Sequence, residues 1–334
     1  MEDKIKTSLP KTTLDLLKKD CEDFKVVKPN GAPNMNQFIN TLLVNFYEEF
    51  SAGEEELHDK IKDALFSVPE AYKKNAFNEI IKVITKRQGN LSFQKQSASL
   101  SFKPTKESER AVIYIETVAL KNETLSSFYR RLFIAYSQRT KNEREKIIFK
   151  DTYNLLEKAV KKNVQVCITL KSDGRVFEDV SIFSIASAKE ELFNYVLCYS
   201  RKNNHTLRLA SIKEVYLLPH KSIIPSKNEE LFKRQIECGV QYPFYQSDNA
   251  SIKVELTEKG KELFKKIYLY RPTPVSVNGN VYTFNCSANQ LLYYFERFGE
   301  NALILSPKRL GIFMRNYYHY ALKKYRSIYG KEQL

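Results

Sequence analysis

The sequence lacks the short motifs that mark the common enzyme classes. It contains no H-E-x-x-H, no P-loop, no G-x-S-x-G and no G-x-G-x-x-G. The four histidines are too far apart in the chain to show any metal-ligand spacing. Arg315 and His319 are spaced as Arg-x3-His, one residue short of the Arg-x4-His nuclease pattern. These absences predict a protein that is not an enzyme and that holds no metal and no cofactor.

Cysteine is scarce and unpaired. The five cysteines are odd in number and none stands in a C-x-x-C pair, which argues against a disulfide framework and against a zinc site. The chain also lacks a signal peptide and any run of about 18 apolar residues. We therefore expect a cytoplasmic protein with buried, reduced thiols and no membrane partner.

Positive charge is what the sequence has in excess. Lysine and arginine number 54 against 39 acidic residues, a formal net charge of +15. Such an excess predicts an anionic partner, with nucleic acid ahead of membrane. The alternative is a lysine-rich surface that only keeps the protein in solution. With 334 residues, 43% hydrophobic, the chain is long enough for two or three ordered domains.

The N-terminal segment shows a strand, a helix, a turn and a second helix. Residues 4–10 alternate as a short strand that ends in proline, and residues 11–24 have the apolar spacing of an amphipathic helix. Residues 29–34 read as a turn. Asn34 suits the N-cap of a helix that runs to Phe50.

This order resembles the ribbon–helix–helix family. The resemblance implies that two strands pair into an antiparallel ribbon that enters the DNA major groove. Alternation turns Lys4, Lys6 and Ser8 outward, at the family's base-reading positions. The helix start at Asn34 matches the position that grips a phosphate. The alternative is a dimerisation ribbon whose lysines are merely solvated.

The same order recurs further along the chain. Residues 97–104 read as a strand, followed by helices over 107–120 and 124–139, and two helices over 54–66 and 69–87 lie between the copies. We infer a second, degenerate ribbon–helix–helix unit whose strand pairs with the first. The sequence leaves open whether that pairing occurs within one chain or between chains. Cations on its last helix either hold phosphates or form a solvated face: Arg130, Arg131 and Arg139.

Residues 163–218 read as a series of short strands. Apolar and polar residues alternate from Val164 to Leu170, which predicts a strand. Ser172-Asp173-Gly174 predicts a turn. Further strands are predicted over 176–185, 195–199, 206–209 and 212–218. We place another turn at Asn203-Asn204. Five short strands in so few residues favour a small barrel.

This stretch resembles the WYL domain, an Sm-like barrel of bacterial regulators. The family's Trp-Tyr-Leu strand falls on Asn194-Tyr195-Val196, and its Phe-Arg-Leu-x-Arg-Ile strand falls on residues 207–212. The resemblance implies a ligand pocket with a cation and stacking aromatics. We assign to this pocket Tyr195, Tyr199, His205 and Arg208. The alternative for Arg208 is a salt bridge to Glu178 or Asp179, and for His205 a turn position without a ligand.

The C-terminal part resembles the extension that follows many WYL domains. It has a βαββαβ-like order from residue 251 and a last helix from Pro307 to about Tyr329 with an apolar stripe. We expect an α+β protein with domains at 1–150, 151–245 and 246–334. The last of these is a candidate for dimerisation.

The whole arrangement is similar to the WYL accessory proteins encoded beside type VI-D CRISPR effectors. That resemblance implies binding of single-stranded RNA and enhancement of an effector RNase. We also expect a homodimer, and the sequence leaves open whether RNA or DNA is bound. The alternatives are a dimeric regulator that reads DNA and, with less support, a ribonuclease with a dispersed site.

Overall fold

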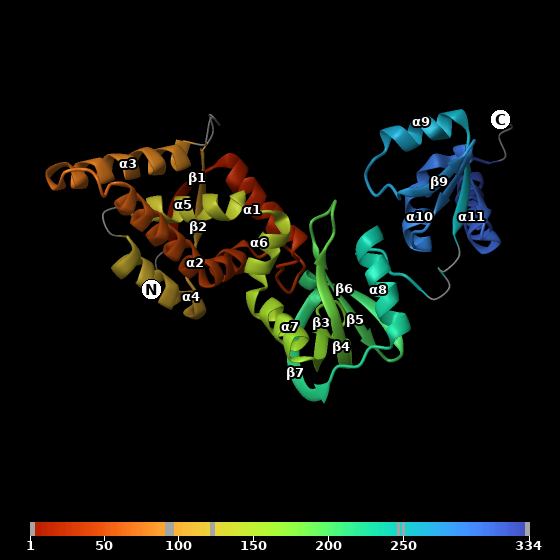
Figure 1. Cartoon of the computed structure of the whole chain (residues 1–334), viewed down its shortest axis with the longest axis horizontal. Coiled ribbons are helices and arrows are strands. Elements are labelled where there is room, and N and C mark those ends of the chain that lie inside the picture. The colour runs from red at the N-terminus through yellow and green to blue at the C-terminus, as the bar shows by residue number, and fades with distance from the viewer. Residues whose placement is uncertain (1–3, 91–96, 121–123, 246–247, 249–250, 331–334) are drawn as a thin grey trace. The chain divides into compact units, whose positions relative to one another are not determined.

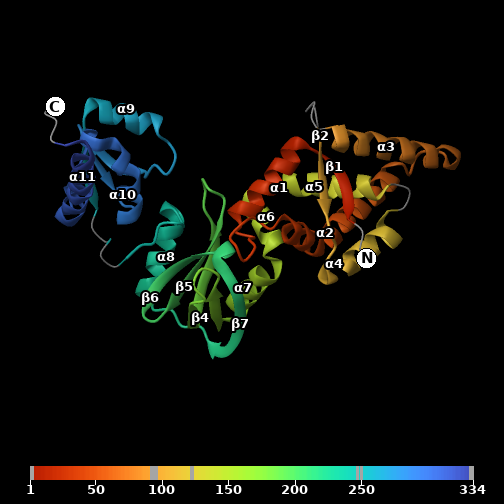
Figure 2. The ribbon, with the colours of Figure 1, turned by 180° about the vertical axis from the view of Figure 1, so that it is seen from behind.

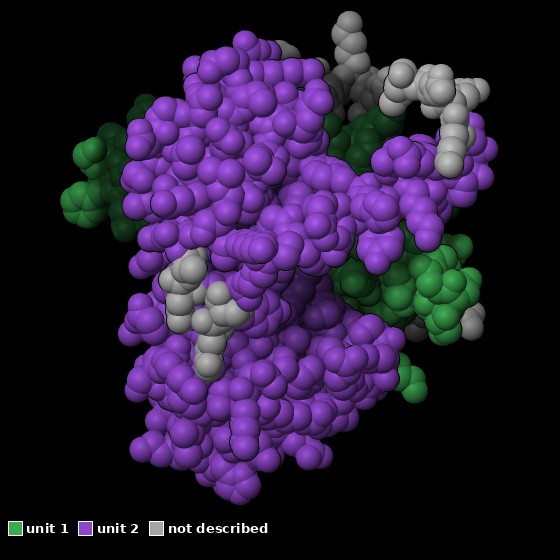
Figure 3. All heavy atoms as spheres, turned by 90° about the vertical axis from the view of Figure 1, so that its right-hand side faces the viewer, with its two compact units in different colours: residues 1–153 green, residues 154–334 purple. Residues whose placement is uncertain are grey.

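The computed structural model describes residues 4–90, 97–120, 124–245, 248 and 251–330, without the side chains of 85–90. It is an α+β fold with three antiparallel sheets (Figures 1 and 2). The chain divides into two compact units, Met1–Tyr153 and Asn154–Leu334, coloured separately in Figure 3. The finer division into three domains stays a prediction.

The first unit is helical around one two-stranded ribbon. Its strands are β1 (Ile5–Pro10) and β2 (Ser97–Phe102). Its helices are α1 (Lys11–Asp23), α2 (Met35–Ala64), α3 (Glu70–Asn90), α4 (Lys106–Tyr114) with the π-helical turn η1 (Ile115–Ala119), α5 (Leu125–Gln138), α6 (Lys141–Ile148) and the start of α7 (Lys150–Lys162).

The ribbon forms within one chain, which settles the pairing that the sequence left open. β1 and β2 run antiparallel, with Thr7 opposite Leu100. Thr7, Leu9, Leu100 and Phe102 are buried, so alternation directs one face of the ribbon into the helices. That face packs on the apolar stripes of α2 and α5.

Two helix boundaries differ from the prediction. α2 continues to Ala64, where the sequence suggested an end at Phe50 and a separate helix over 54–66. Gly53 lies in the interior of α2, where one glycine costs about 1 kcal/mol and does not by itself end a helix. α6 is a helix that the sequence analysis did not predict. Thr140 and Glu143 form its capping box, a signal present in the sequence as Thr-x-x-Glu.

The second unit begins with α7 and a five-stranded sheet. The strands are β3 (Val164–Leu170), β4 (Val176–Ser187), β5 (Asn194–Ser200), β6 (Asn203–Arg208) and β7 (Ile212–Lys221), with a 3₁₀ turn, η2 (Leu209–Ser211), before the last. Their order in the sheet is β6-β5-β4-β3-β7. α8 (Ser226–Cys238) lies beside β5 and β6 in both ribbon views.

The turn between β5 and β6 is displaced from the predicted position. Arg201 and Lys202 occupy it with φ of 50° and 65°, whereas Asn203 and Asn204 belong to β6. The side chain of Asn203 donates to the carbonyl of Arg201 at 3.0 Å. Two successive positive φ angles suit the tight turns that match strand twist, and here the strand pairing imposes them on residues other than asparagine or glycine.

The C-terminal region has the predicted order and its own core. It contains β8 (Ile252–Leu256), α9 (Glu258–Lys266), β9 (Pro274–Asn278), β10 (Val281–Phe284), α10 (Ala288–Phe295), η4 (Glu296–Asn301), β11 (Ala302–Ser306) and α11 (Lys308–Tyr329). The sheet order is β11-β8-β10-β9. α11 approaches β11 closely at Gly311, where a Cβ would lie 2.9 Å from the carbonyl oxygen of Ile304.

Candidate nucleic-acid interface

The outward face of the ribbon carries lysine and serine. Lys4 and Lys6 are exposed and Ser8 is half-buried, as the alternation predicted. On the other strand Ser101 lies opposite Lys6, and Ser99 lies opposite Ser8. Ammonium groups attract phosphates, and hydroxyl groups both donate to and accept from phosphate oxygens and base edges. This face is therefore chemically suited to a nucleic acid.

Helix α5 holds the first strand of the ribbon. The hydroxyl of Thr7 donates to the carbonyl of Ser126 at 2.9 Å. The Nε of Arg130 donates to the carbonyl of Ser8 at 2.8 Å. Arg130 was predicted to hold a phosphate, and the structure gives it this structural bond to β1.

Helix α2 holds the second strand in the corresponding way. The amide of Asn40 donates to the carbonyl of Lys103 at 3.0 Å and accepts from Ser108 at 2.5 Å. Asn36 exchanges two hydrogen bonds with the backbone of Lys103, at 2.7 and 3.1 Å. Asn36 and Asn40 occupy the same places in the internal repeat as Ser126 and Arg130. Each copy thus holds the other copy's strand in a pseudo-twofold arrangement. Of its anchoring residues, the sequence pointed only to Arg130, and to that one as a phosphate ligand.

The two second helices also begin alike. The side chain of Asn34 accepts from the backbone N–H of Gln37 at 3.2 Å, and that of Thr124 accepts from Ser127 at 3.2 Å. Asn34 is therefore the N-cap that the sequence predicted. A helix start directs its remaining N–H groups outward and favours a nearby anion.

Two further predicted arginines are engaged with acidic residues. Arg131 forms an ion pair with Glu54 and its side chain is 10% exposed, with the guanidinium over the rings of Phe50 and Phe128. This burial takes Arg131 off the surface on which a phosphate contact was expected. Arg139 pairs with Glu49 at 2.8 Å, and both of these side chains are about half exposed.

A buried ionic network holds the helices behind the ribbon. Arg144 donates to Asp20 through Nε at 2.6 Å and through Nη2 at 3.0 Å. The hydroxyl of Tyr136 donates to the same carboxylate at 3.1 Å. Burial and then the Asp20 charge raise the pKa of Tyr136 well above its usual value, so its proton stays in place. The network ties α1, α5 and α6 together.

The second predicted site lies on the five-stranded sheet. Tyr195 is directly opposite Arg208, so the two side chains share a face, and Tyr199 lies on that face because it is four residues from Tyr195. Helix α8 lies against this face: Gln235 donates to Thr206 at 2.8 Å, and Phe232 packs with Tyr195 and Tyr199. The structure brings these three predicted residues together beneath α8.

Arg208 is placed against an aromatic ring. Its guanidinium lies over Phe193 at 3.3 Å from the ring centroid. Arg208 pairs with Tyr195 of β5, and Tyr195 in turn pairs with Ala186 of β4. Glu178 lies eight residues before Ala186 on β4. That is roughly 25 Å along the strand. The alternative salt bridge to Glu178 or Asp179 is therefore wrong.

His205 lies apart from the other three pocket residues. Strand alternation puts it on the opposite face from Arg208. Its Nε2 is 3.1 Å from the carbonyl oxygen of Ser200, and its ring meets Phe177 edge-on at 5.1 Å. These contacts explain the residue structurally, without a ligand.

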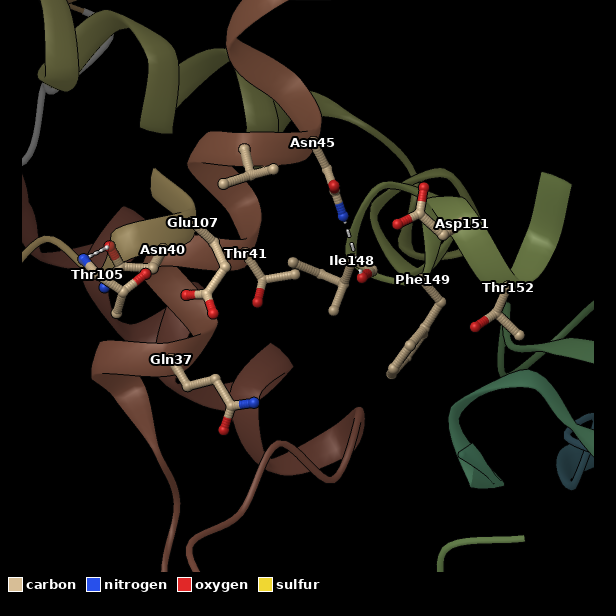
Figure 4. A pocket seen from close by; sticks show the side chains of 11 residues that line it. Gln37, Asn40, Thr41, Asn45, Thr105, Glu107, Ile148, Phe149, Asp151 and Thr152 are labelled. Atoms are coloured by element: carbon tan, nitrogen blue, oxygen red, sulfur yellow. Dashed lines mark hydrogen bonds between the residues drawn. The ribbon is translucent and has the colours of Figure 1, made fainter. Parts of the chain in front are cut away.

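A polar hollow of about 360 Å³ lies between α2, α4 and the start of α7 (Figure 4). Its lining includes the carboxylates of Glu107 and Asp151, which repel phosphate. The amide of Asn45 points into its wall and donates to the carbonyl oxygens of Ile147 at 2.8 Å and Ile148 at 3.3 Å. Within the described residues, no group of three or more His, Cys, Asp or Glu is placed to hold a metal ion. None of the helices described there is long and apolar enough to span a membrane.

Comparison with known proteins identifies the fold. No protein-family model matches the sequence, and no curated protein matches it. The structure is similar to that of a CRISPR Cas-related protein, with a TM-score of 0.68 and 17% identity over 98% of this chain and 95% of that chain. A proteasome accessory factor B/C of Arthrobacter aurescens matches with a TM-score of 0.23 and 17% identity, covering 70% of this chain and 38% of that chain. The first likeness, which spans nearly both chains, shows that the two share an α+β fold.

Proposed function

We propose that this protein is a non-catalytic regulator that binds single-stranded RNA and modulates the RNase of a CRISPR effector. The observation that carries the proposal is the exposed lysine and serine face of the ribbon, on a chain with a net charge of +15. Counterion release on phosphate binding would supply most of the affinity.

The arrangement of strands supports the finer assignments of fold. The paired β1 and β2, each followed by two helical segments, fit a tandem ribbon–helix–helix module. The order β6-β5-β4-β3-β7, with a 3₁₀ turn before the last strand, fits an Sm-like barrel of the WYL type. The fold shared with a CRISPR Cas-related protein supports the CRISPR setting.

The second candidate is a dimeric transcriptional regulator that reads duplex DNA. The antiparallel ribbon favours it, because a two-stranded ribbon fits the DNA major groove. Under this proposal the sheet face with Tyr195, Tyr199 and Arg208 senses a ligand.

One experiment separates the two candidates. Labelled single-stranded RNA, single-stranded DNA and duplex DNA are titrated in parallel at two salt concentrations. Single-stranded RNA should bind most tightly, and its affinity should fall with salt. Equal or tighter binding of a duplex would favour the DNA-reading regulator. No binding to any of the three would reject both.

A further inference from the structure

The first unit contains a second cavity, of about 590 Å³, away from the ribbon face. It lies among the second half of α2, α3, the α4–η1 segment and α5. Cavities of roughly 300–1,000 Å³ hold small organic ligands in proteins. Its size and position on the ribbon module make it a candidate for a regulatory ligand.

One part of the cavity is apolar and aromatic. Phe77 and Ile81 of α3 and Phe128 of α5 contribute side chains to its wall. His58 meets Phe77 edge-on, with ring centroids 5.6 Å apart. Aromatic walls of this kind favour a planar ring, which stacks or meets them edge-on.

One lining residue, Ser51, carries a hydroxyl that is enclosed by the protein. Ser51 is 8% exposed, and its Oγ has no hydrogen-bond partner among the described residues. Leaving a buried hydroxyl unsatisfied costs about 1–3 kcal/mol. The Oγ atom itself is closed off from solvent, so it offers no hydrogen-bonding group to a ligand in the cavity.

Charged side chains of both signs line the cavity: Lys62, Lys82 and Arg131 are basic, and Glu54 and Glu55 are acidic, with Glu54 paired to Arg131. Cations therefore exceed carboxylates by three to two. Lys62 of α2 pairs with Asp59 at 3.0 Å, and Lys82 of α3 pairs with Glu79 at 2.7 Å. All four of these side chains are at least 64% exposed, and surface pairs of this kind are weak. An anionic group on a ligand can therefore compete for both ammonium groups.

We propose that this cavity binds a planar aromatic ligand with a negatively charged group, and that its occupancy is transmitted to the ribbon. The connection is the start of α5. Phe128 and Arg131 line the cavity, while the neighbouring Ser126 and Arg130 hold β1 through the bonds at 2.9 and 2.8 Å. A ligand that fixes the first turns of α5 also fixes the strand that carries Lys4 and Lys6.

The test uses the full chain and 1-anilinonaphthalene-8-sulfonate, an aromatic anion with a planar naphthalene ring, as the probe. The Ala119→Phe variant fills the cavity, and its matched control Val118→Phe adds the same ring at an exposed neighbour outside the lining. Ile81→Trp serves as a second filled variant, and thermal unfolding checks that each variant is folded. We expect one saturable site that the filled variants weaken at least tenfold and the control leaves unchanged. Equal probe binding by folded filled variants and by the control would overturn the site.

Transmission is measured without any nucleic acid, so it does not depend on the proposed function. Hydrogen exchange of Ile5–Pro10 should slow by at least twofold with saturating probe in the native chain, and stay the same in the filled variants. Unchanged exchange in the native chain would overturn the link to the ribbon. Competition by adenosine 5′-monophosphate or by indole-3-acetate then distinguishes a nucleotide from an aryl carboxylate, and failure of both to displace the probe would overturn this ligand class.

Discussion

At the scale of single residues, Asp20 is the buried carboxylate that joins three helices of the first unit. It is 1% exposed and accepts from both Arg144 and Tyr136. Removing it leaves the guanidinium of Arg144 buried without its carboxylate. The network depends on tertiary structure, because Asp20 is 116 residues from Tyr136 and 124 residues from Arg144 in the chain.

We expect Asp20→Ala to lower the free energy of unfolding by about 3–5 kcal/mol, because one half of a buried ion pair is lost. The matched control is Glu49→Ala, which breaks the half-exposed pair with Arg139 and should cost less than about 1 kcal/mol. Urea denaturation measures both. Equal losses in the two variants would contradict the role given to the Asp20 network.

A second residue-scale prediction concerns Arg208 and Phe193. Their stacked contact should contribute about 0.5–2 kcal/mol to stability. A double-mutant cycle with Arg208→Ala and Phe193→Leu measures this coupling by chemical denaturation. If the coupling energy is near zero and Arg208→Ala weakens RNA binding, the prediction is contradicted. Arg208 would then bind a ligand, as the WYL resemblance implies.

At the scale of elements, the ribbon is asymmetric although its clamps are pseudo-symmetric. On the outward side, Lys6 of β1 lies opposite Ser101 of β2, and Ser8 lies opposite Ser99. Exposed lysines flank the ribbon on both strands, with Lys4 just before β1 and Lys103 just after β2. A ribbon formed by two identical chains would present the same residues on both strands. The covalent tandem therefore lets the two strands differ, so that Lys6 on one strand lies opposite a serine on the other.

The double variant Lys4→Ala/Lys6→Ala should weaken RNA binding and reduce the salt slope of the affinity by roughly 1.4, at about 0.7 per phosphate contact on a single strand. Lys259→Ala/Lys265→Ala removes the same charge from exposed positions on α9 and serves as the control. Fluorescence anisotropy at several salt concentrations gives both slopes. Equal effects would mean that net charge, and not the ribbon, governs binding.

At the scale of the whole molecule, α11 leaves apolar surface uncovered within one chain. Leu310 and Met314 are its buried residues, and much of the rest of its apolar side-chain surface is open to solvent. The large exposed side chains are Ile312, Phe313, Tyr317, Tyr320, Leu322, Tyr325, Ile328 and Tyr329. This surface supports the proposal that the protein is a homodimer.

Tyr325→Glu with Ile328→Glu should convert the dimer to a monomer, because two charges would be buried at the interface. Both side chains are about two-thirds exposed in the single chain, so thermal unfolding of the monomer should change little. Sedimentation velocity reads the association state. The control variant Lys323→Ala/Lys324→Ala changes the net charge equally and should leave the dimer intact. If this control also dissociates, the change in net charge, and not the loss of apolar contacts, would explain the dissociation.

The sequence by itself determined the elements and the faces they present. Period-two alternation identified the ribbon strand with Lys4 and Lys6 outward and the strand from Val164 to Leu170. Turn residues and short apolar runs indicated the other strands up to residue 218. Asn34 as an N-cap and the order of the C-terminal elements were also predicted, because caps, turns and periodicity depend on neighbours along the chain. The missed boundaries at Gly53 and Thr140 were local signals that were interpreted incorrectly.

Only the tertiary structure decided which residues meet. It paired β1 with β2 inside one chain, placed Arg131 against Glu54, and set Arg208 on Phe193 and not near Glu178. The sequence does not distinguish a lysine or arginine that faces solvent from one that contacts a phosphate or a buried carboxylate. The role of such a side chain follows from contacts between segments that are up to 124 residues apart, and periodicity carries no information about them.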